Sequence, residues 1–111
     1  MYDLSDELKD FLKLLGDKTR LNILYLLAEE EHTAREIRKT LGKSQSTISQ
    51  HLKLLRDAEL IDSEIKENTN LYHLKDPNII KLLDSIRTFI ISQKKEQLKK
   101  FRDIDRRETL F

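Results

Sequence analysis

Apolar residues recur every three or four positions through the first half of the chain, which is the spacing of one face of an α-helix. They predict helices over residues 5–15, 18–28 and 34–41 and from Ser44 to about Ala58. Thr33 and Glu36 have the sequence pattern of a capping box, in which each side chain bonds the other residue's amide. Asp17 and Ser44 suit N-caps, and glycines suit the ends of the first and third helices.

The pattern changes after residue 59. Residues 60–66 partly alternate and residues 71–74 are strand-like, with polar turn residues between them, so this segment predicts a β-hairpin. Asp76 and Pro77 then have the pattern of a helix start, with Asp as N-cap and Pro in the first turn. Helical spacing continues to about Arg107, a length of roughly 45 Å, which exceeds what a small core can cover.

This order of elements predicts a mainly α fold with one β-hairpin (α+β), a winged helix-turn-helix, in a single domain over residues 1–111. The helix-turn-helix is expected at about 33–58, the wing at about 60–75 and a C-terminal dimerisation helix at about 77–107. No apolar run is long enough to predict a membrane span. Because the N-terminus is acidic and the chain contains no cysteine, we expect a cytoplasmic protein without disulfides or thiolate metal sites.

Charge is distributed unevenly along a chain whose net charge is only +1. Residues 1–31 carry four cationic and eight acidic side chains, whereas residues 32–56 carry six cationic side chains and one acid, Glu36. The remaining 55 residues balance at eleven of each sign. Local charge decides where a polyanion binds, so the basic segment points to nucleic acid. A solvated helix face would explain such a run of charge by itself.

The predicted helix at 44–58 has a polar face opposite its core face. If Ile48 points to the core, the 100° step per residue places several polar side chains on the other side. Gln can bond adenine through two hydrogen bonds, and Ser or Thr can bond several base edges. We interpret this face and the helix N-terminus as a DNA-contacting set: Ser44, Gln45, Ser46, Thr47, Ser49, Gln50 and Lys53. For any one hydroxyl residue, capping or simple exposure is an equally good explanation.

The same helix argues against an enzyme. A catalytic triad of Ser49, His51 and Asp57 fails because all three lie on one helix, where Ser49 and His51 point about 160° apart. The sequence has no glycine-rich phosphate loop. We therefore predict no catalytic residue and no cofactor.

Two segments resemble the arsenical-resistance repressor (ArsR) family of winged-helix regulators. They are residues 14–24, LLGDKTRLNIL, and residues 44–58, SQSTISQHLKLLRDA, and the resemblance extends over about residues 10–85. It implies a homodimeric transcription repressor that binds double-stranded DNA. It also implies that helix 44–58 enters the major groove of a palindromic operator, with the hairpin near the backbone or minor groove.

The resemblance and the basic segment extend the expected DNA contacts beyond that helix. The added residues are Arg35 and Lys43 near the helix-turn-helix and, at the wing tip, Lys66, Asn68, Thr69 and Asn70. The resemblance also implies pairing through the first and last helices, and the last helix has apolar residues at the 3–4 spacing of a helix seam. The expected dimerisation residues are Leu4, Leu8, Phe11, Ile79, Leu83, Ile86 and Ile90.

The chain departs from the family pattern in three places. Glu59 stands where a glycine usually follows Ala58, and the wing tip lacks the usual Arg and Gly. The chain also has no cysteine, and its histidines (His32, His51 and His73) are scattered, so we predict that it does not sense metals. His51 is expected to be packed or near a phosphate. The first two departures leave open an alternative function, a winged-helix protein-interaction module without specific DNA binding.

Overall fold

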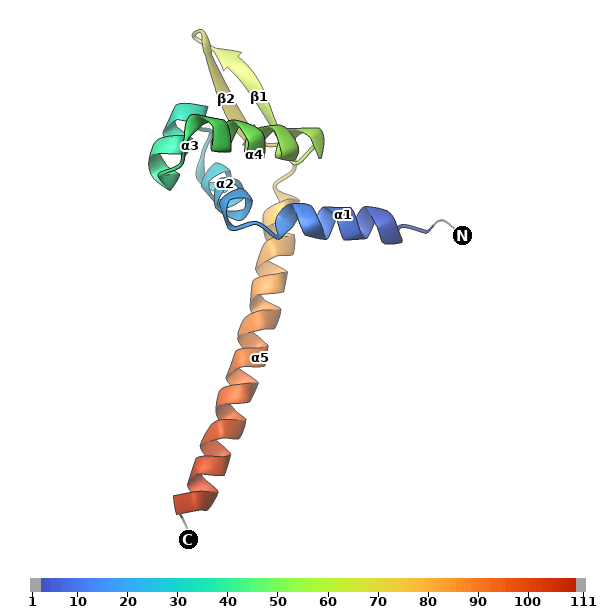
Figure 1. Ribbon diagram of the computed structural model, residues 1–111, viewed down its shortest axis with the longest axis vertical. Coiled ribbons are helices and arrows are strands. Elements are labelled where there is room, and N and C mark those ends of the chain that lie inside the picture. Colours follow the sequence, from blue (N-terminus) through green and yellow to red (C-terminus); the bar gives the residue numbers. More distant parts are fainter. Residues whose placement is uncertain (1–2, 110–111) are drawn as a thin grey trace. The chain divides into compact units, whose positions relative to one another are not determined.

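The computed structural model describes the backbone of residues 3–109 and the side chains of residues 3–104. The elements are α1 (Ser5–Leu15), α2 (Lys18–Glu29), α3 (Ala34–Leu41), α4 (Gln45–Asp57), β1 (Ile61–Lys66), β2 (Thr69–Leu74) and α5 (Asn78–Thr109). They form two compact units, one ending at Pro77 and one starting at Asn78 (Figure 1). The predicted mainly helical α+β fold with one hairpin is confirmed.

The predicted N-caps of α2, α3 and α4 are present. Asp17 accepts a hydrogen bond from the Arg20 amide at 2.9 Å, and Ser44 accepts one from the Thr47 amide at 3.2 Å. At the start of α3, both bonds of the capping box between Thr33 and Glu36 are formed. These side chains satisfy amides that have no partner within their own helix, which fixes where α2, α3 and α4 begin.

Two glycines end helices in different conformations. Gly42 follows α3 with a φ of 64°, the left-handed conformation that glycine adopts most readily. Gly16 is the C-cap of α1 with a φ of −78°, which any residue can adopt. The turn between α3 and α4 therefore uses Gly42 where the backbone is left-handed.

The hairpin is tighter than predicted. Its strands pair antiparallel from Ile61 with Leu74 to Lys66 with Thr69, so only Glu67 and Asn68 form the turn. Both have positive φ values, 51° and 62°, as in the type I′ turn that suits two-residue hairpins. Strand β2 thus begins two residues before the predicted strand.

The core of the first unit comes from one side of each helix and from the base of the hairpin. Its largest fully buried side chains are Ile23, Leu24, Ile37, Ile48, Leu55 and Ile61. A backbone pairing that the sequence did not predict joins the α2–α3 connection to the wing. The His32 amide bonds the Tyr72 carbonyl at 3.2 Å, and the Tyr72 amide bonds the His32 carbonyl at 2.8 Å. This pairing holds the base of the wing beside the helix-turn-helix.

The second unit consists of α5, which begins at Asn78, one residue after the predicted start. Within the chain Ile79 and Leu83 are buried, whereas many other large apolar side chains of α5 are exposed. The exposed ones are Leu82, Ile86, Phe89, Ile90, Ile91, Leu98, Phe101 and Ile104. No helix in the part of the chain that the structure describes is both long and apolar enough to cross a membrane.

Candidate nucleic-acid interface

The core residues of α4 fix which side of the helix faces outward. Ile48, Leu52 and Leu55 are 1%, 3% and 0% exposed, so the helix cannot rotate without exposing a buried stripe. The opposite face is exposed and polar, as predicted: Ser46, Ser49, Gln50, Lys53 and Asp57. Packing of apolar side chains thus presents a row of hydrogen-bonding groups to solvent.

Hydroxyl groups gather at the N-terminus of α4. The Ser44 Oγ lies 2.9 Å from the Thr47 Oγ1 and 3.3 Å from the Ser46 Oγ. Ser44 already caps the helix, and Thr47 is half-buried, so both side chains contribute to the structure of the free protein. Gln45 is exposed, and no described residue bonds its side chain. It is therefore the side chain of this turn with the most freedom to bond an incoming group.

A hollow lies beside Gln45, between α3 and the first half of α4. Its lining residues are Ala34, Arg35, Arg38, Gln45, Ile48 and Ser49. Arg35 was predicted to contact DNA, but Arg38 was not. The charge count of residues 32–56 included Arg38, yet its place in this hollow depends on how α3 packs on α4, which the sequence does not specify.

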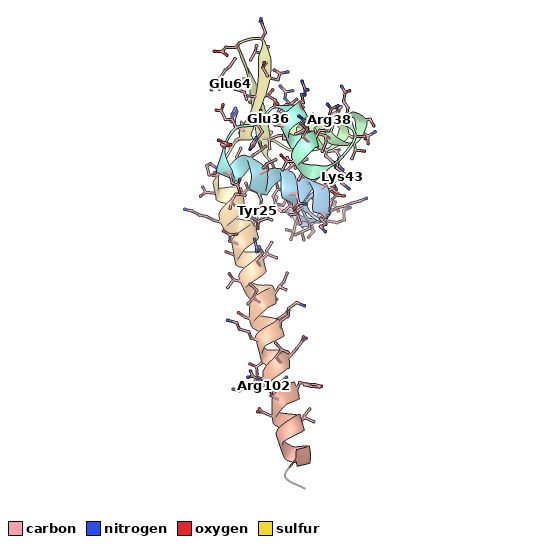
Figure 2. The ribbon with its side chains drawn as sticks, turned by 90° about the vertical axis from the view of Figure 1, so that its left-hand side faces the viewer. Tyr25, Glu36, Arg38, Lys43, Glu64 and Arg102 are labelled. Carbon is pink, nitrogen blue, oxygen red and sulfur yellow. The ribbon has the colours of Figure 1, made fainter. Side chains whose placement is uncertain are left out.

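The basic side chains around the interface differ in how they are paired. Lys53 bonds Asp57 at 3.0 Å on the same helix, and Arg56 bonds the Ser63 hydroxyl at 2.8 Å. By contrast, four basic side chains form no ion pair with any residue that the structure describes: Arg35, Arg38, Lys39 and Lys43. Figure 2 shows Arg38 and Lys43 on the helical part of the unit, apart from Glu64 on the hairpin. Around this interface, the unpaired positive charge therefore lies on α3 and on the α3–α4 turn.

The wing tip is exposed and polar but not basic. Lys66, Asn68, Thr69 and Asn70 are all exposed there, as predicted. The Lys66 ammonium lies 3.2 Å from the Glu31 carboxylate, and two acids, Glu64 and Glu67, flank it on the hairpin. The wing therefore offers hydrogen-bonding groups, while its one lysine is already paired.

Glu59 adopts the conformation that the usual glycine would take. Its φ is 61°, its amide bonds the Arg56 carbonyl at 2.9 Å, and the Leu60 amide bonds the Leu55 carbonyl at 3.0 Å. The departure from the family pattern thus preserves the turn from α4 into the wing. It does so with a side chain in the left-handed region, which costs ~1 kcal/mol.

The first family-like segment has a structural role in holding α4. The Arg20 guanidinium donates from Nε to the Leu14 carbonyl at 2.6 Å and lies 3.1 Å from the His51 Nδ1 through Nη1. The Asp17 carboxylate accepts a hydrogen bond from the Arg20 amide, and this bond lowers the pKa of the Asp17 carboxyl below its ordinary value. These bonds tie the α1–α2 junction to the middle of α4. His51 is therefore a packed histidine, in keeping with the first of the two predicted roles.

His32 is buried, and its Nε2 has no hydrogen-bond partner among the residues that the structure describes. The His32 Nδ1 lies 3.4 Å from the Glu36 carboxylate. The pKa of the Glu36 carboxyl is lowered, mainly because it accepts a hydrogen bond from the Thr33 amide. Among the residues with described placement, no three His, Cys, Asp or Glu side chains are grouped in a way that could hold a metal.

The predicted dimerisation residues divide into two groups. Leu4, Leu8, Ile86 and Ile90 are 57%, 58%, 39% and 44% exposed, and Phe11 is half-buried. Ile79 and Leu83 are 7% and 5% exposed within the chain.

Comparison with known proteins agrees with this architecture. Residues 17–63 match the family described as "Bacterial regulatory protein, arsR family". The arsenical resistance operon repressor of Staphylococcus aureus is 38% identical over 85 residues, covering 74% of this chain and 82% of that protein. Across curated relatives, the matched part ranges from 57% to 91% of the relative's length.

Solved structures share the fold. Rv0081 of Mycobacterium tuberculosis has a TM-score of 0.81 and 26% identity, with 88% of this chain and 99% of that one covered. A Mycobacterium bovis domain, Mb0332, described as a homodimeric winged helix-turn-helix DNA-binding domain, has a TM-score of 0.71 at 22% identity, covering 86% and 93%. By sequence and fold together, this chain belongs to the ArsR family of winged helix-turn-helix DNA-binding transcription regulators, which are not enzymes.

Proposed function

We propose that this protein is a homodimeric repressor that binds a palindromic DNA operator through α4 and does not respond to metals. One observation carries the proposal: the exposed polar face of α4 lies beside basic side chains that form no ion pair with any described residue. Such a surface offers hydrogen bonds for base edges and positive charge for the backbone. The S. aureus relative is named as an operon repressor, which supports the sign of the regulation.

Within this proposal Gln45 and Ser46 bond base edges in the major groove, because they are exposed in the first turn of α4. Ser49, Gln50 and Lys53 follow along the same face. Lys43 contacts the backbone before the helix starts. The wing tip makes a weaker second contact through Asn68, Thr69 and Asn70, since its lysine is paired with Glu31.

Dimerisation rests on the amount of apolar surface that the single chain leaves exposed. Leu4, which precedes α1, and Leu8 and Leu12 on α1 are each more than half exposed, and so are Phe89 and Phe101 on α5. Exposed apolar surface of this extent is typical of a protein-interaction site. A two-fold dimer would present two α4 helices to half-sites about 34 Å apart, which is why the operator is expected to be palindromic.

The test is selection of bound duplexes from a random DNA pool at near-physiological salt. Three proteins are run in parallel: the wild type, Gln45→Ala/Ser46→Ala, and Asn22→Ala, an exposed polar position on α2. We expect the wild type and the Asn22 variant to recover one palindromic motif and the α4 variant to lose it. A folded dimeric wild type that recovers no motif would contradict the proposal and favour the protein-interaction module.

The metal part of the proposal has its own readout. Operator affinity is expected to stay within the error of the measurement when Zn²⁺, Ni²⁺ or Cu²⁺ is added in slight molar excess over protomer. A change of tenfold or more that a chelator reverses would show that the protein responds to that metal.

A further inference from the structure

We infer that Arg35 and Arg38 of α3 form a clamp for one backbone phosphate of the operator, seated in the hollow beside Gln45. This inference rests on the proposed function and adds to it an anchoring site that positions the base-reading residues. It assigns a role to Arg38, which the sequence did not single out.

The two arginines face the same hollow. They are three residues apart on a helix, so they lie on the same face of α3. Both line the hollow that Gln45 and Ser49 line from α4. Arg35 is exposed and Arg38 is half-buried, so the pair combines an accessible cation with one held closer to the protein surface.

The positive charges of the two arginines are not neutralised by described neighbours. Neither arginine forms an ion pair with any residue whose placement is described. The one acid of α3, Glu36, is engaged elsewhere: its Oε1 accepts from the Thr33 amide at 3.1 Å, and its Oε2 lies 3.4 Å from the His32 Nδ1. The arginines therefore keep their positive charge available for an anion from outside.

The chemistry of the lining favours phosphate. Guanidinium groups bind phosphate oxygens in a planar, two-bond geometry and are weakly hydrated, so two of them are suited to hold one phosphate. Ala34 and Ile48 contribute apolar surface to the same hollow, which leaves fewer groups to compete for the guanidinium donors. A phosphate held there would fix the position of the DNA backbone relative to α3. Gln45 and Ser49, on the same hollow, would then lie at a fixed distance from the strand they read.

The test is the salt dependence of duplex binding. Affinities of the full-length wild type and of Arg35→Gln/Arg38→Gln are measured between about 50 and 200 mM salt, on the selected operator and on a scrambled duplex. Loss of one phosphate contact per protomer should make the slope of log K against log salt shallower by about 2 per dimer. Both duplexes should weaken, because a phosphate contact carries no sequence information. The operator should weaken at least as much as the scrambled duplex, because the clamp also positions Gln45 and Ser49.

The matched control is Lys39→Gln, which removes an exposed, unpaired charge from the same helix outside the hollow. Its slope should change by less than half as much. Two results would overturn the clamp: an arginine variant whose slope matches that of the Lys39 variant, or one that loses preference at a single base pair, which would mean that an arginine reads a base.

The scrambled duplex separates this inference from the proposed function. If selection yields no motif but the arginine variant still flattens the salt slope on an arbitrary duplex, the proposed operator fails and the clamp stands. If the wild type binds its operator and the arginine variant has an unchanged slope, only the clamp fails. A wild type that binds no duplex would contradict both.

Discussion

The α3–α4 surface and the wing tip are both exposed and polar, yet they differ in how their charges are paired. On α3 and the turn after it, four basic side chains form no ion pair with a described residue. At the wing tip the single lysine, Lys66, is paired with Glu31 at 3.2 Å, and Glu64 and Glu67 lie nearby in the hairpin. The pairing of a cation, more than its exposure, therefore decides whether it can attract a polyanion.

Sequence distance explains why this contrast is hidden in the chain. Lys66 and Glu31 are 35 positions apart, and the backbone pairing of His32 with Tyr72 joins the two segments. The basic residues of α3 form no such ion pair with any residue in the part of the chain that the structure describes. In our proposal the helix-turn-helix therefore supplies most of the binding energy and the wing supplies an auxiliary contact.

The largest expected effect comes from separating the two α4 helices of a dimer. Ile86→Asp/Ile90→Asp places two charges on the exposed apolar side of α5, where both side chains are about two-fifths exposed. We expect monomers by sedimentation and a loss of operator affinity of ~100-fold, because the second half-site no longer benefits from linkage. Thr88→Asp/Ser92→Asp adds two charges on the opposite, exposed face of α5, and this matched control should stay dimeric. A double variant that remains dimeric would place the interface elsewhere.

The next largest effect is expected at the first turn of α4. Gln45→Ala should weaken operator binding by ~1–3 kcal/mol if its amide bonds a base, and leave scrambled duplex unaffected. Gln50→Ala, an exposed glutamine farther along the same helix, provides the comparison. Fluorescence anisotropy on both duplexes measures the difference. Equal weakening on both duplexes would show that Gln45 contacts the backbone.

A smaller effect is expected on the wing. Lys66→Ala should change operator affinity by less than ~1 kcal/mol, because its ammonium is already paired with Glu31. Lys43→Ala, which removes an unpaired lysine before α4, should weaken binding more and reduce the salt dependence. The comparison between the two regions breaks down if the Lys66 variant loses more affinity than the Lys43 variant.

The smallest effect concerns the turn between α4 and the wing. Glu59→Gly should raise the free energy of unfolding by ~0.5–1 kcal/mol, since it removes a side chain from a left-handed backbone and loses only an exposed ion pair with Lys75. Glu59→Ala keeps the backbone cost and serves as the control in urea unfolding. An alanine variant as stable as the glycine variant would show that the backbone conformation carries no cost.

Local signals in the sequence predicted most of the fold. The caps at Asp17, Thr33 and Ser44 lie where their residue types predict, because a cap depends on contacts within four residues. The hairpin was predicted too, but its turn was placed too broadly. Glu67 is not a typical residue for a positive φ, so the sequence did not mark where the turn begins.

Features that depend on distant segments were not predictable. The periodicity of α5 treats Ile79, Leu83, Ile86 and Ile90 alike, yet the first two are buried and the last two are exposed. The place of Arg38 beside Gln45 depends on the packing of α3 on α4. For the candidate site, the sequence thus predicted which side chains are exposed but not which cations are free.

The most direct test of the central claim is an operator scan. Affinities for every single-base-pair substitution of the selected operator are measured with the wild type, Gln45→Ala and Asn68→Ala. We predict that the Asn68 variant keeps the wild-type order of preferences, whereas the Gln45 variant loses discrimination at one or two positions in each half-site. Loss of discrimination in the Asn68 variant, with the Gln45 variant unchanged, would contradict the claim that α4 reads the operator.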